Sequence, residues 1–370
     1  MTVSSTNART ADSCSTSTSK ENAFHVFPWK WSLSELKDVP WNGFNVFSCF
    51  SCGGGSSMGY KRAGFHVLGN VEIDRDMNKI YCVNHKPKYN YNMDIRDFNA
   101  IPNEELPEEL FNLDILDGSP PCSVFSAAGE REKGWNTEKQ FREGQKMQRL
   151  DDLFFMFIET VKKLKPKTVI AENVKGLISG KAKGYVAEII KAFKEAGYSV
   201  QIFLLNASSM GVPQRRERVF FIAYRNDLKL PKLALDFNEP PIYFKDVRSK
   251  DGVPLKPGTQ TYELMQKRIP SDTRLSDICI RLYGRNSGFT NYIWSDEQVS
   301  GTIASGGSYF RMYDGMGLSN QDFINIQTFP QDYNFVDQSV QYVCGMSVPP
   351  VMMAQISRQV YLQWLRKLKQ

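Results

Sequence analysis

Residues 44 to 74 carry the pattern that most limits what this chain can fold into. The apolar run Phe44–Ser48 predicts a strand, a glycine-rich turn follows it, and the next predicted helix ends near Gly64. A second apolar run, Val67–Ile73, contains Glu72 and predicts another strand. Strand, glycine turn, helix, strand and acid is the order found in the nucleotide-binding half of a doubly wound α/β fold.

The glycine turn has the sequence Phe50-Ser51-Cys52-Gly53-Gly54-Gly55. Glycines let the backbone approach an anionic group at a helix N-terminus, and an acid roughly 17 to 20 residues later can accept hydrogen bonds from a ribose. The spacing is not GxGxxG, so a nicotinamide-dependent dehydrogenase fits poorly. A turn that holds no ligand is the simpler alternative.

The alternation of strands and helices continues to about residue 224 and then stops. We expect helices over 75–83, 150–164 and 186–196, and strands that end at 92–95 or run over 113–117, 168–174, 200–205 and 219–224. Residues 225–300 are rich in Pro, Gly, Asp and Lys and have no long helical pattern. The fold class we predict is α/β, with a doubly wound, mostly parallel sheet and a second, smaller irregular domain.

The same patterns divide the chain. We expect a disordered tail over 1–22, a first domain over 41–224, a second over 225–300, and a return to the first domain over 301–370 that ends in a helix. The tail is rich in Ser and Thr without an apolar core, so we do not expect a signal peptide. No apolar run approaches the roughly 18 residues that span a bilayer, so we expect a cytoplasmic protein with no membrane partner.

Composition narrows the classes of function only slightly. A net charge of +6 over 370 residues permits nucleic-acid binding without establishing it. The seven cysteines are odd in number and scattered, which favours reduced thiols. Cys49 and Cys52 form a CxxC pair, but no second pair of ligands lies near, so we expect no metal site. A thioredoxin-like redox pair is an alternative that lacks the usual Gly-Pro.

The segment Gly118-Ser119-Pro120-Pro121-Cys122 follows the predicted strand over 113–117. A thiol at the carboxyl end of a strand, stiffened by two prolines, is placed where a doubly wound enzyme keeps a nucleophile. The alternative is that Cys122 is a small buried apolar residue, as free cysteines often are.

Two more polar groups stand at strand ends. Glu172 and Asn173 end the strand over 168–174, and three arginines between residues 215 and 218 precede the strand over 219–224. Those arginines either form a solvated face or point into a cleft and bind a phosphate or a base carbonyl.

Taken in order, these motifs and a closing Gly-Met-Ser-Val-Pro-Pro resemble the DNA (cytosine-5) methyltransferase family, in its compact bacterial or phage form. The resemblance covers residues 44–224 and 301–360. It implies that the first domain is catalytic and binds S-adenosylmethionine, and that residues 225–300 are a target recognition domain. It implies double-stranded DNA as the partner.

The resemblance also implies roles for individual residues. Cofactor-binding residues would be Phe50, Ser51, Cys52, Gly53, Gly54, Gly55, Glu72 with Ile73 beside it, Asp94 with Ile95, and Pro120. Catalytic residues would be Cys122, Glu172, Asn173 and Arg218, with Arg216 as second choice for holding the base carbonyl. Gln214 and Thr302 would bind DNA.

The chemistry that the resemblance implies depends on a thiol. The thiolate of Cys122 would add to carbon 6 of cytosine, which makes carbon 5 nucleophilic enough to take a methyl group. Glu172 would supply a proton at ring nitrogen 3. The base must be flipped out of the duplex.

Several positions depart from the family pattern. Cys52 stands where the family has Gly, and a positive φ there would cost about 1–3 kcal/mol. Gln321-Asp322 replaces an Arg-Glu pair, Thr328 replaces a Gly, and Gly345-Met346 replaces a Gly-Asn pair.

Two other readings of the chain remain open. A tRNA cytosine-5 methyltransferase shares this fold, although the chain lacks a Cys-Phe-Thr signature. A non-catalytic DNA-binding paralogue would have no reason to keep Cys122, Glu172 and Arg218 together. We expect a monomer, with a restriction endonuclease as a possible companion.

Overall fold

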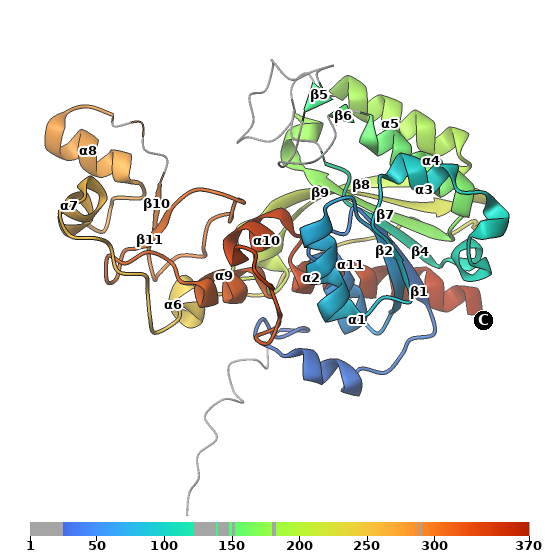
Figure 1. Ribbon diagram of the computed structural model, residues 1–370, viewed down its shortest axis with the longest axis horizontal. Helices are drawn as coiled ribbons and strands as arrows, with labels where there is room; N and C mark the ends of the chain where they lie inside the picture. The colour runs from blue at the N-terminus through green and yellow to red at the C-terminus, as the bar shows by residue number, and fades with distance from the viewer. Residues whose placement is uncertain are drawn as a thin grey trace, which may run out of the picture.

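The computed structural model describes residues 25–121, 138–139, 148–149, 152–179, 183–286, 288 and 291–369. The tail predicted over 1–22 lies outside these residues, and so does Cys122. The described chain forms a large lobe built on one sheet and a smaller lobe beside it (Figure 1).

The sheet of the large lobe has seven strands in the order β3-β2-β1-β4-β7-β9-β8. Its first five strands are parallel, and β9 runs antiparallel to both of its neighbours. The prediction of a doubly wound, mostly parallel sheet is therefore confirmed. The strands are β1 (Asn45–Cys49), β2 (His66–Val71), β3 (Tyr89–Tyr91), β4 (Ile115–Gly118), β7 (Thr168–Val174), β8 (Tyr198–Asn206) and β9 (Glu217–Arg225).

Helices cover both faces of this sheet (Figure 1). One face packs against α3 (Ile95–Ala100), α4 (Leu153–Leu164) and α5 (Lys183–Glu195). The other packs against α1 (Gly55–Arg62) and α11 (Pro350–Gln363), with α2 (Arg75–His85) beside α1. Amphipathic helices on two sides of a sheet with near-continuous apolar strands bury both faces, which is the arrangement that parallel sheets require.

The smaller lobe contains short elements. They are α6 (Phe244–Val247), α7 (Gln260–Gln266), α8 (Leu275–Tyr283), β10 (Tyr292–Trp294) and β11 (Tyr309–Arg311). Because β11 pairs with β10, the sheet of this lobe takes one strand from beyond residue 300. The chain then returns through α9 (Asn320–Gln327) and α10 (Val340–Met346). One further two-stranded sheet is formed by β5 (Glu138–Lys139) and β6 (Gln148–Arg149).

One predicted strand end was misplaced. The sequence predicts a strand that ends at 92–95, whereas β3 ends at Tyr91 and Asp94 is the N-cap of α3. The carboxylate of Asp94 accepts a hydrogen bond from the backbone N–H of Arg96 at 2.8 Å. A capping acid starts a helix and so shortens the strand before it.

The C-terminal helix closes the core beneath α1. The sequence predicts inward-facing Val351, Ile356, Val360 and Leu365, and all four are fully buried. Helix α11 ends at Gln363, and a 3₁₀ helix over Leu365–Lys369 follows it. The close approach of α1 to α11 depends on Gly59, which faces the start of α11.

We expect the substitution Gly59→Ala to lower the free energy of unfolding by about 2 kcal/mol, because overpacking a tight contact costs about 1–3 kcal/mol. An added Cβ would lie 2.5 Å from the carbonyl oxygen of Pro350 and 2.6 Å from the Cβ of Met353. Urea denaturation measures the change. The matched control is Gly184→Ala in α5, where an added Cβ meets nothing within 4 Å and helix propensity favours Ala. Equal stability of the two variants would contradict the packing argument.

Candidate active site

The turn after β4 is fastened to strands on both sides. The backbone N–H of Ser119 donates to the carbonyl of Cys49 in β1 at 3.3 Å. The side-chain amide of Asn173 in β7 donates to the carbonyl of Pro120 at 3.1 Å, and its Oδ1 accepts from the next backbone N–H at 2.9 Å. Asn173 is buried. The turn that leads to Cys122 is therefore held at the carboxyl edge of the sheet.

Glu172 and Arg218 form an ion pair at the same edge. The distance from Nε of Arg218 to Oε1 of Glu172 is 2.9 Å, and the side chains are 15% and 12% exposed. The antiparallel register puts Arg218 opposite Val174, two residues beyond Glu172 on the neighbouring strand. Burial lowers the pKa of Arg218, and the Glu172 carboxylate opposes that change. A guanidinium so placed orients the carboxylate.

Arg216 is placed differently from Arg218. Its Nη1 donates to the carbonyl of Ile303 at 2.9 Å and its Nη2 to the carbonyl of Gly345 at 2.8 Å. The side chain is 2% exposed, and burial lowers its pKa well below the ordinary range. These contacts connect the start of β9 to two C-terminal segments, so Arg216 holds backbone rather than facing open space.

Gln214 is fully buried as well. Its Nε2 donates to Oε1 of Gln327 at 2.6 Å, and its Oε1 accepts from the N–H of Ile303 at 3.0 Å. In this arrangement both polar ends of the side chain bind inside the protein, and they fix the 301–304 segment. Thr302 is exposed, and its hydroxyl donates to the carbonyl of Arg215 at 2.8 Å.

Glu72 lies on the other side of β1, at the end of β2. Its two carboxylate oxygens accept from the backbone N–H groups of Cys52 at 2.7 Å and Asp74 at 2.8 Å. Asn92 donates to the Glu72 carbonyl at 2.7 Å. Burial raises the pKa of Glu72 to about 7, although the two backbone hydrogen bonds oppose the rise. The acid thus spans the glycine turn and the end of β2.

A small pocket opens next to Glu72, with mostly apolar walls and one acid. It is lined by Phe50, Val71, Ile73, Met93, Asp94, Ile95 and Leu153. The sequence predicted four of these residues, and the other apolar walls, from β2, the β3–α3 connection and α4, were missed. Apolar walls with one hydrogen-bond acceptor fit a flat heteroaromatic ring.

The glycine turn has an unusual backbone. Phe50 has φ of 54° and Cys52 has φ of 47°, in the left-handed region that L-residues rarely adopt. Cys52 therefore carries the strain expected if its position requires positive φ. Burial, with the nearby Glu72 carboxylate, raises the pKa of the Cys52 thiol to about 12. Ser51 is buried, and its Oγ accepts from Nδ2 of Asn70 at 3.0 Å.

The three glycines of the turn pack closely against other parts of the protein, two of them against its C-terminal part. A Cβ on Gly53 would lie 2.5 Å from the Val343 side chain, and one on Gly55 would lie 2.4 Å from the carbonyl oxygen of Val348. A Cβ on Gly54 would overlap the ring of His85. The sequence interpretation gave these glycines to the cofactor, and close internal packing is a further reason why the turn needs residues without a side chain.

The described residues contain no group of three or more His, Cys, Asp or Glu side chains arranged to hold a metal ion. Their five cysteines are all free. No helix in this part of the chain is long and apolar enough to cross a membrane.

A family model for C-5 cytosine-specific DNA methylases matches residues 44–361, which is most of the chain. The chain belongs to this family. The resemblance inferred from the ordered motifs is therefore confirmed.

Individual relatives agree with the family model. The chain is 40% identical to the type II methyltransferase M.FnuDI of Fusobacterium nucleatum over 52% of its own length and 50% of that protein. It is 32% identical to the type II methyltransferase M.NgoPII of Neisseria gonorrhoeae over 58% and 59%. The chain spans about half the length of these curated relatives.

A solved structure matches this chain over its whole length. A mutant of DNMT2 from Spodoptera frugiperda superposes with a TM-score of 0.58 at 18% identity, covering 86% of this chain and 100% of that one. At this identity the likeness concerns the fold alone.

In this cytosine methylase family member, one buried acid escaped the sequence interpretation. Asp117 ends the apolar part of β4 and is 1% exposed. It accepts from the hydroxyls of Ser48 at 2.7 Å and Tyr60 at 3.0 Å. An acid inside an otherwise apolar strand, just before Gly-Ser-Pro-Pro-Cys, was the available signal. Burial raises the pKa of Asp117 to about 7.

We expect Asp117 to make the protein less stable as pH rises. Its pKa is about 7 in the folded state and about 3.9 in the unfolded state, so between these values the folded state binds more protons. The contribution of Asp117 to the free energy of unfolding is then fully present below about pH 4 and is lost as pH rises through 7. The substitution Asp117→Asn should remove part of this slope, measured by urea denaturation from pH 5 to 8.

In that variant the free energy of unfolding should still fall with rising pH, because Glu72 also has a pKa of about 7. The control is Glu159→Gln, which alters an acid that is 48% exposed and should follow the wild-type profile. If the free energy of unfolding of Asp117→Asn varies with pH as that of the wild type does, Asp117 does not have the raised pKa.

Proposed function

We propose that this protein transfers a methyl group from S-adenosylmethionine to carbon 5 of cytosine in double-stranded DNA. The observation that carries the proposal is the fastened Ser119–Pro121 turn, which leads to Cys122, beside the ion pair of Glu172 and Arg218. Family membership supports the same chemistry. The cytosine must leave the duplex to reach such a site, as in other enzymes that modify bases.

The proposed nucleophile is the thiolate of Cys122. It adds to carbon 6 of the ring, which breaks the aromatic system and places electron density on carbon 5. After the methyl group has bonded to carbon 5, a base removes the proton there and the thiolate is expelled from carbon 6. A thiol suits both steps because it is a strong nucleophile at neutral pH and a good leaving group.

Glu172 is the proposed acid for the ring. A carboxyl group that shares a proton with ring nitrogen 3 withdraws electrons from the ring and favours addition at carbon 6. Arg218, on Oε1 of the same carboxylate, fixes its orientation and leaves the second oxygen for the base. Asn173, which holds the Pro120 carbonyl, is a positioning residue for the turn before Cys122.

The small pocket beside β1 and β2 supports a site for the adenine end of S-adenosylmethionine. Glu72 would accept hydrogen bonds from the ribose hydroxyls. The adenine ring would bind in the pocket between Phe50, Ile73 and Ile95, with Asp94 near its amino group. When bound, the cofactor supplies a methyl group on a positively charged sulfur.

The remaining partners are proposals of smaller scope. We propose that the protein acts as a monomer on duplex DNA, in the cytoplasm, with a restriction endonuclease as its companion. Two relatives that carry type II in their names support the companion. Sequencing DNA modified by the pure protein maps the methylated cytosines, and transfer to tRNA measured in parallel distinguishes the two substrate classes.

We expect Cys122→Ser to lower methyl transfer to duplex DNA by more than about 1,000-fold, because an alcohol is a far weaker nucleophile than a thiolate at neutral pH. DNA binding should survive. The measurement is incorporation of a labelled methyl group. A duplex with 5-fluorocytosine at the target should trap a covalent adduct with the wild type alone.

The matched control is Cys82→Ser, which removes a half-buried thiol from α2, away from the site. It should keep wild-type activity. Appreciable turnover by Cys122→Ser, or no trapped adduct with the wild type, would remove the covalent mechanism.

We expect S-adenosylmethionine to bind more weakly as pH falls below 7. The pKa of Glu72 is about 7, and only the ionised carboxylate accepts hydrogen bonds with both oxygens. Affinity should fall at most tenfold per pH unit below 7 and level off above it. Calorimetry from pH 5.5 to 8.5 measures this profile.

Two variants test the role of Glu72. Glu72→Ala should raise the Kd of the cofactor by about 10- to 100-fold, since hydrogen bonds to a charged acceptor contribute about 1.5–3 kcal/mol. Glu72→Gln should give a Kd that does not depend on pH. Unchanged cofactor affinity in both variants would contradict the ribose assignment.

A further inference from the structure

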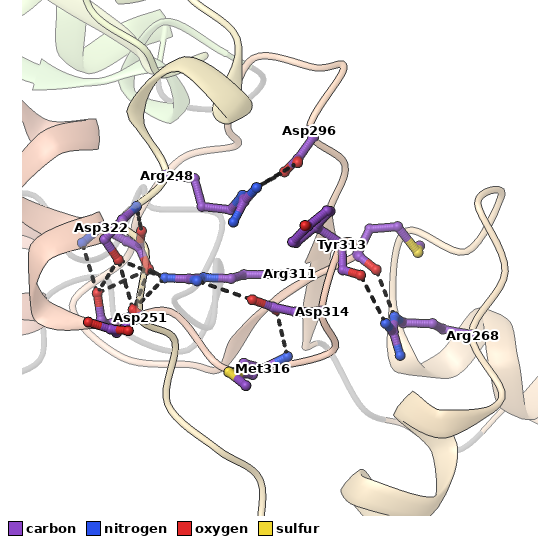
Figure 2. Close-up of polar contacts among 12 residues, drawn as sticks. Arg248, Asp251, Arg268, Asp296, Arg311, Tyr313, Asp314, Met316 and Asp322 are labelled. Atoms are coloured by element: carbon purple, nitrogen blue, oxygen red, sulfur yellow. Dashed lines mark hydrogen bonds and ion pairs between the residues drawn. The ribbon is translucent and has the colours of Figure 1, made fainter.

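A turn in the smaller lobe is held by three arginines, from three different segments (Figure 2). The turn follows β11 and has the sequence Met312-Tyr313-Asp314-Gly315-Met316. Arg311, at its start, is fully buried. Its Nη1 lies 3.3 Å from the Asp314 carboxylate, which in turn accepts the N–H of Met316 at 3.0 Å.

Arg311 also connects the turn to the body of the protein. Its Nη2 lies 2.5 Å from the carboxylate of Asp322 in α9, and both side chains are 0% exposed. The same nitrogen donates to Oγ of Ser249 and to the carbonyl of Asp251, each at 2.7 Å. A buried ion pair with added hydrogen bonds fixes the root of the turn.

Arg268 holds the backbone at the tip. Its Nε donates to the carbonyl of Met312 at 2.7 Å, and its Nη2 donates to the carbonyl of Tyr313 at 3.3 Å. Gly315, with φ of 74°, lies so close that an added Cβ would be 2.6 Å from Nη1 of Arg268. Gly315 therefore leaves the space that the Arg268 guanidinium occupies.

Arg248 holds the side chain at the tip. Its guanidinium carbon lies 4.1 Å from the centroid of the Tyr313 ring. Asp296 fixes Arg248 through two parallel contacts, at 3.1 and 3.2 Å. Tyr313 is nevertheless 67% exposed. The Arg248 guanidinium supports one face of the ring (Figure 2), and most of the ring's surface faces solvent.

The Tyr313 side chain is held in place before any partner binds. A surface tyrosine usually loses side-chain entropy when a partner immobilises it, and here the turn and Arg248 have removed much of that freedom in advance. Tyrosine is also a favoured contact residue, because it offers a large stiff surface with a polar tip.

The location of the turn favours the DNA substrate as the partner. The hydroxyl of Tyr309, at the start of β11, accepts from the N–H of Ala304, in the segment held by Arg216 beside the Glu172–Arg218 pair. Tyr313 follows Tyr309 by four residues, first in strand β11 and then in the turn, so the two lie at most about 13 Å apart, the length of four extended residues. A duplex that presents a base to the site extends farther than this, since one helical turn measures about 34 Å.

We propose that Tyr313 is a DNA-contact residue, whose exposed ring packs against a nucleotide of the duplex near the target cytosine. The inference rests on the proposed function. An aromatic ring stacks on a base or a sugar without reading one sequence.

The test compares Tyr313→Ala, Tyr313→Phe and the wild type, each as the full chain. The probe is a duplex oligonucleotide that carries the methylation site mapped for the wild type. Tyr313→Ala should raise the Kd and the KM for this duplex by about tenfold, the size of effect expected from losing one base–aromatic stack. Its kcat at saturating DNA and its Kd for S-adenosylmethionine should stay within about twofold of wild type. Tyr313→Phe, which keeps the ring, should restore binding.

Two further variants separate a contact from a general effect. Tyr283→Ala removes another exposed tyrosine of the same lobe, 55% exposed on α8, and should bind DNA as the wild type does. Arg248→Gln, which removes the support of the ring, should weaken DNA binding by about threefold, the size expected from one unfixed side chain.

The outcomes are distinct. DNA binding by Tyr313→Ala equal to that of a wild type that methylates DNA would overturn the contact and leave the proposed function standing. Equal losses in Tyr313→Ala and Tyr283→Ala, or a loss in Tyr313→Phe equal to that in Tyr313→Ala, would also overturn it. A wild type that neither binds nor methylates duplex DNA would overturn the proposed function and this inference together.

Discussion

The reversed direction of β9 is the constraint on which the site depends. Strands β4 and β7 run parallel, so Pro120 and Glu172 come to the same edge at their carboxyl ends. Because β9 runs antiparallel to β7, its beginning lies at that edge, and Arg218 meets Glu172 there. A parallel strand in this place would put the same arginine at the opposite edge, about seven residues away.

The reversal also brings the residues before β9 to the edge, where they connect it to distant parts of the chain. Arg216 and Gln214 bind Ile303, and Arg216 also binds Gly345. The C-terminal part in turn shapes the glycine turn, because Gly53 faces the Val343 side chain at a distance that admits no Cβ. The glycine turn, the arginines before β9 and the last helices therefore pack together as one unit.

The sequence predicted most of the fold because apolar periodicity, helix caps and glycine turns depend on residues that are close together in the sequence. It could not predict that β9 lies between β7 and β8, since a period of two does not specify a neighbour or a direction. The same limit applies to the site. Arg216 and Arg218 are indistinguishable in the sequence, and only long-range packing buries one against backbone carbonyls and gives the other to Glu172. Likewise the partners of Asp117 come from β1 and α1.

The departures from the family pattern show how local changes are absorbed. Thr328 adopts φ of 60° where the family has Gly, and its Oγ1 accepts the N–H of Val351 at 3.2 Å, a contact that glycine does not offer. Asp322 retains a guanidinium partner in Arg311, although the arginine next to it in the family is Gln321 here. Cys52, which has φ of 47°, is held through its backbone N–H, which the Glu72 carboxylate accepts at 2.7 Å. Since that carboxylate is also the proposed ribose ligand, the strain at Cys52 and the cofactor pocket are coupled through a single side chain, and a change at either one acts on the other.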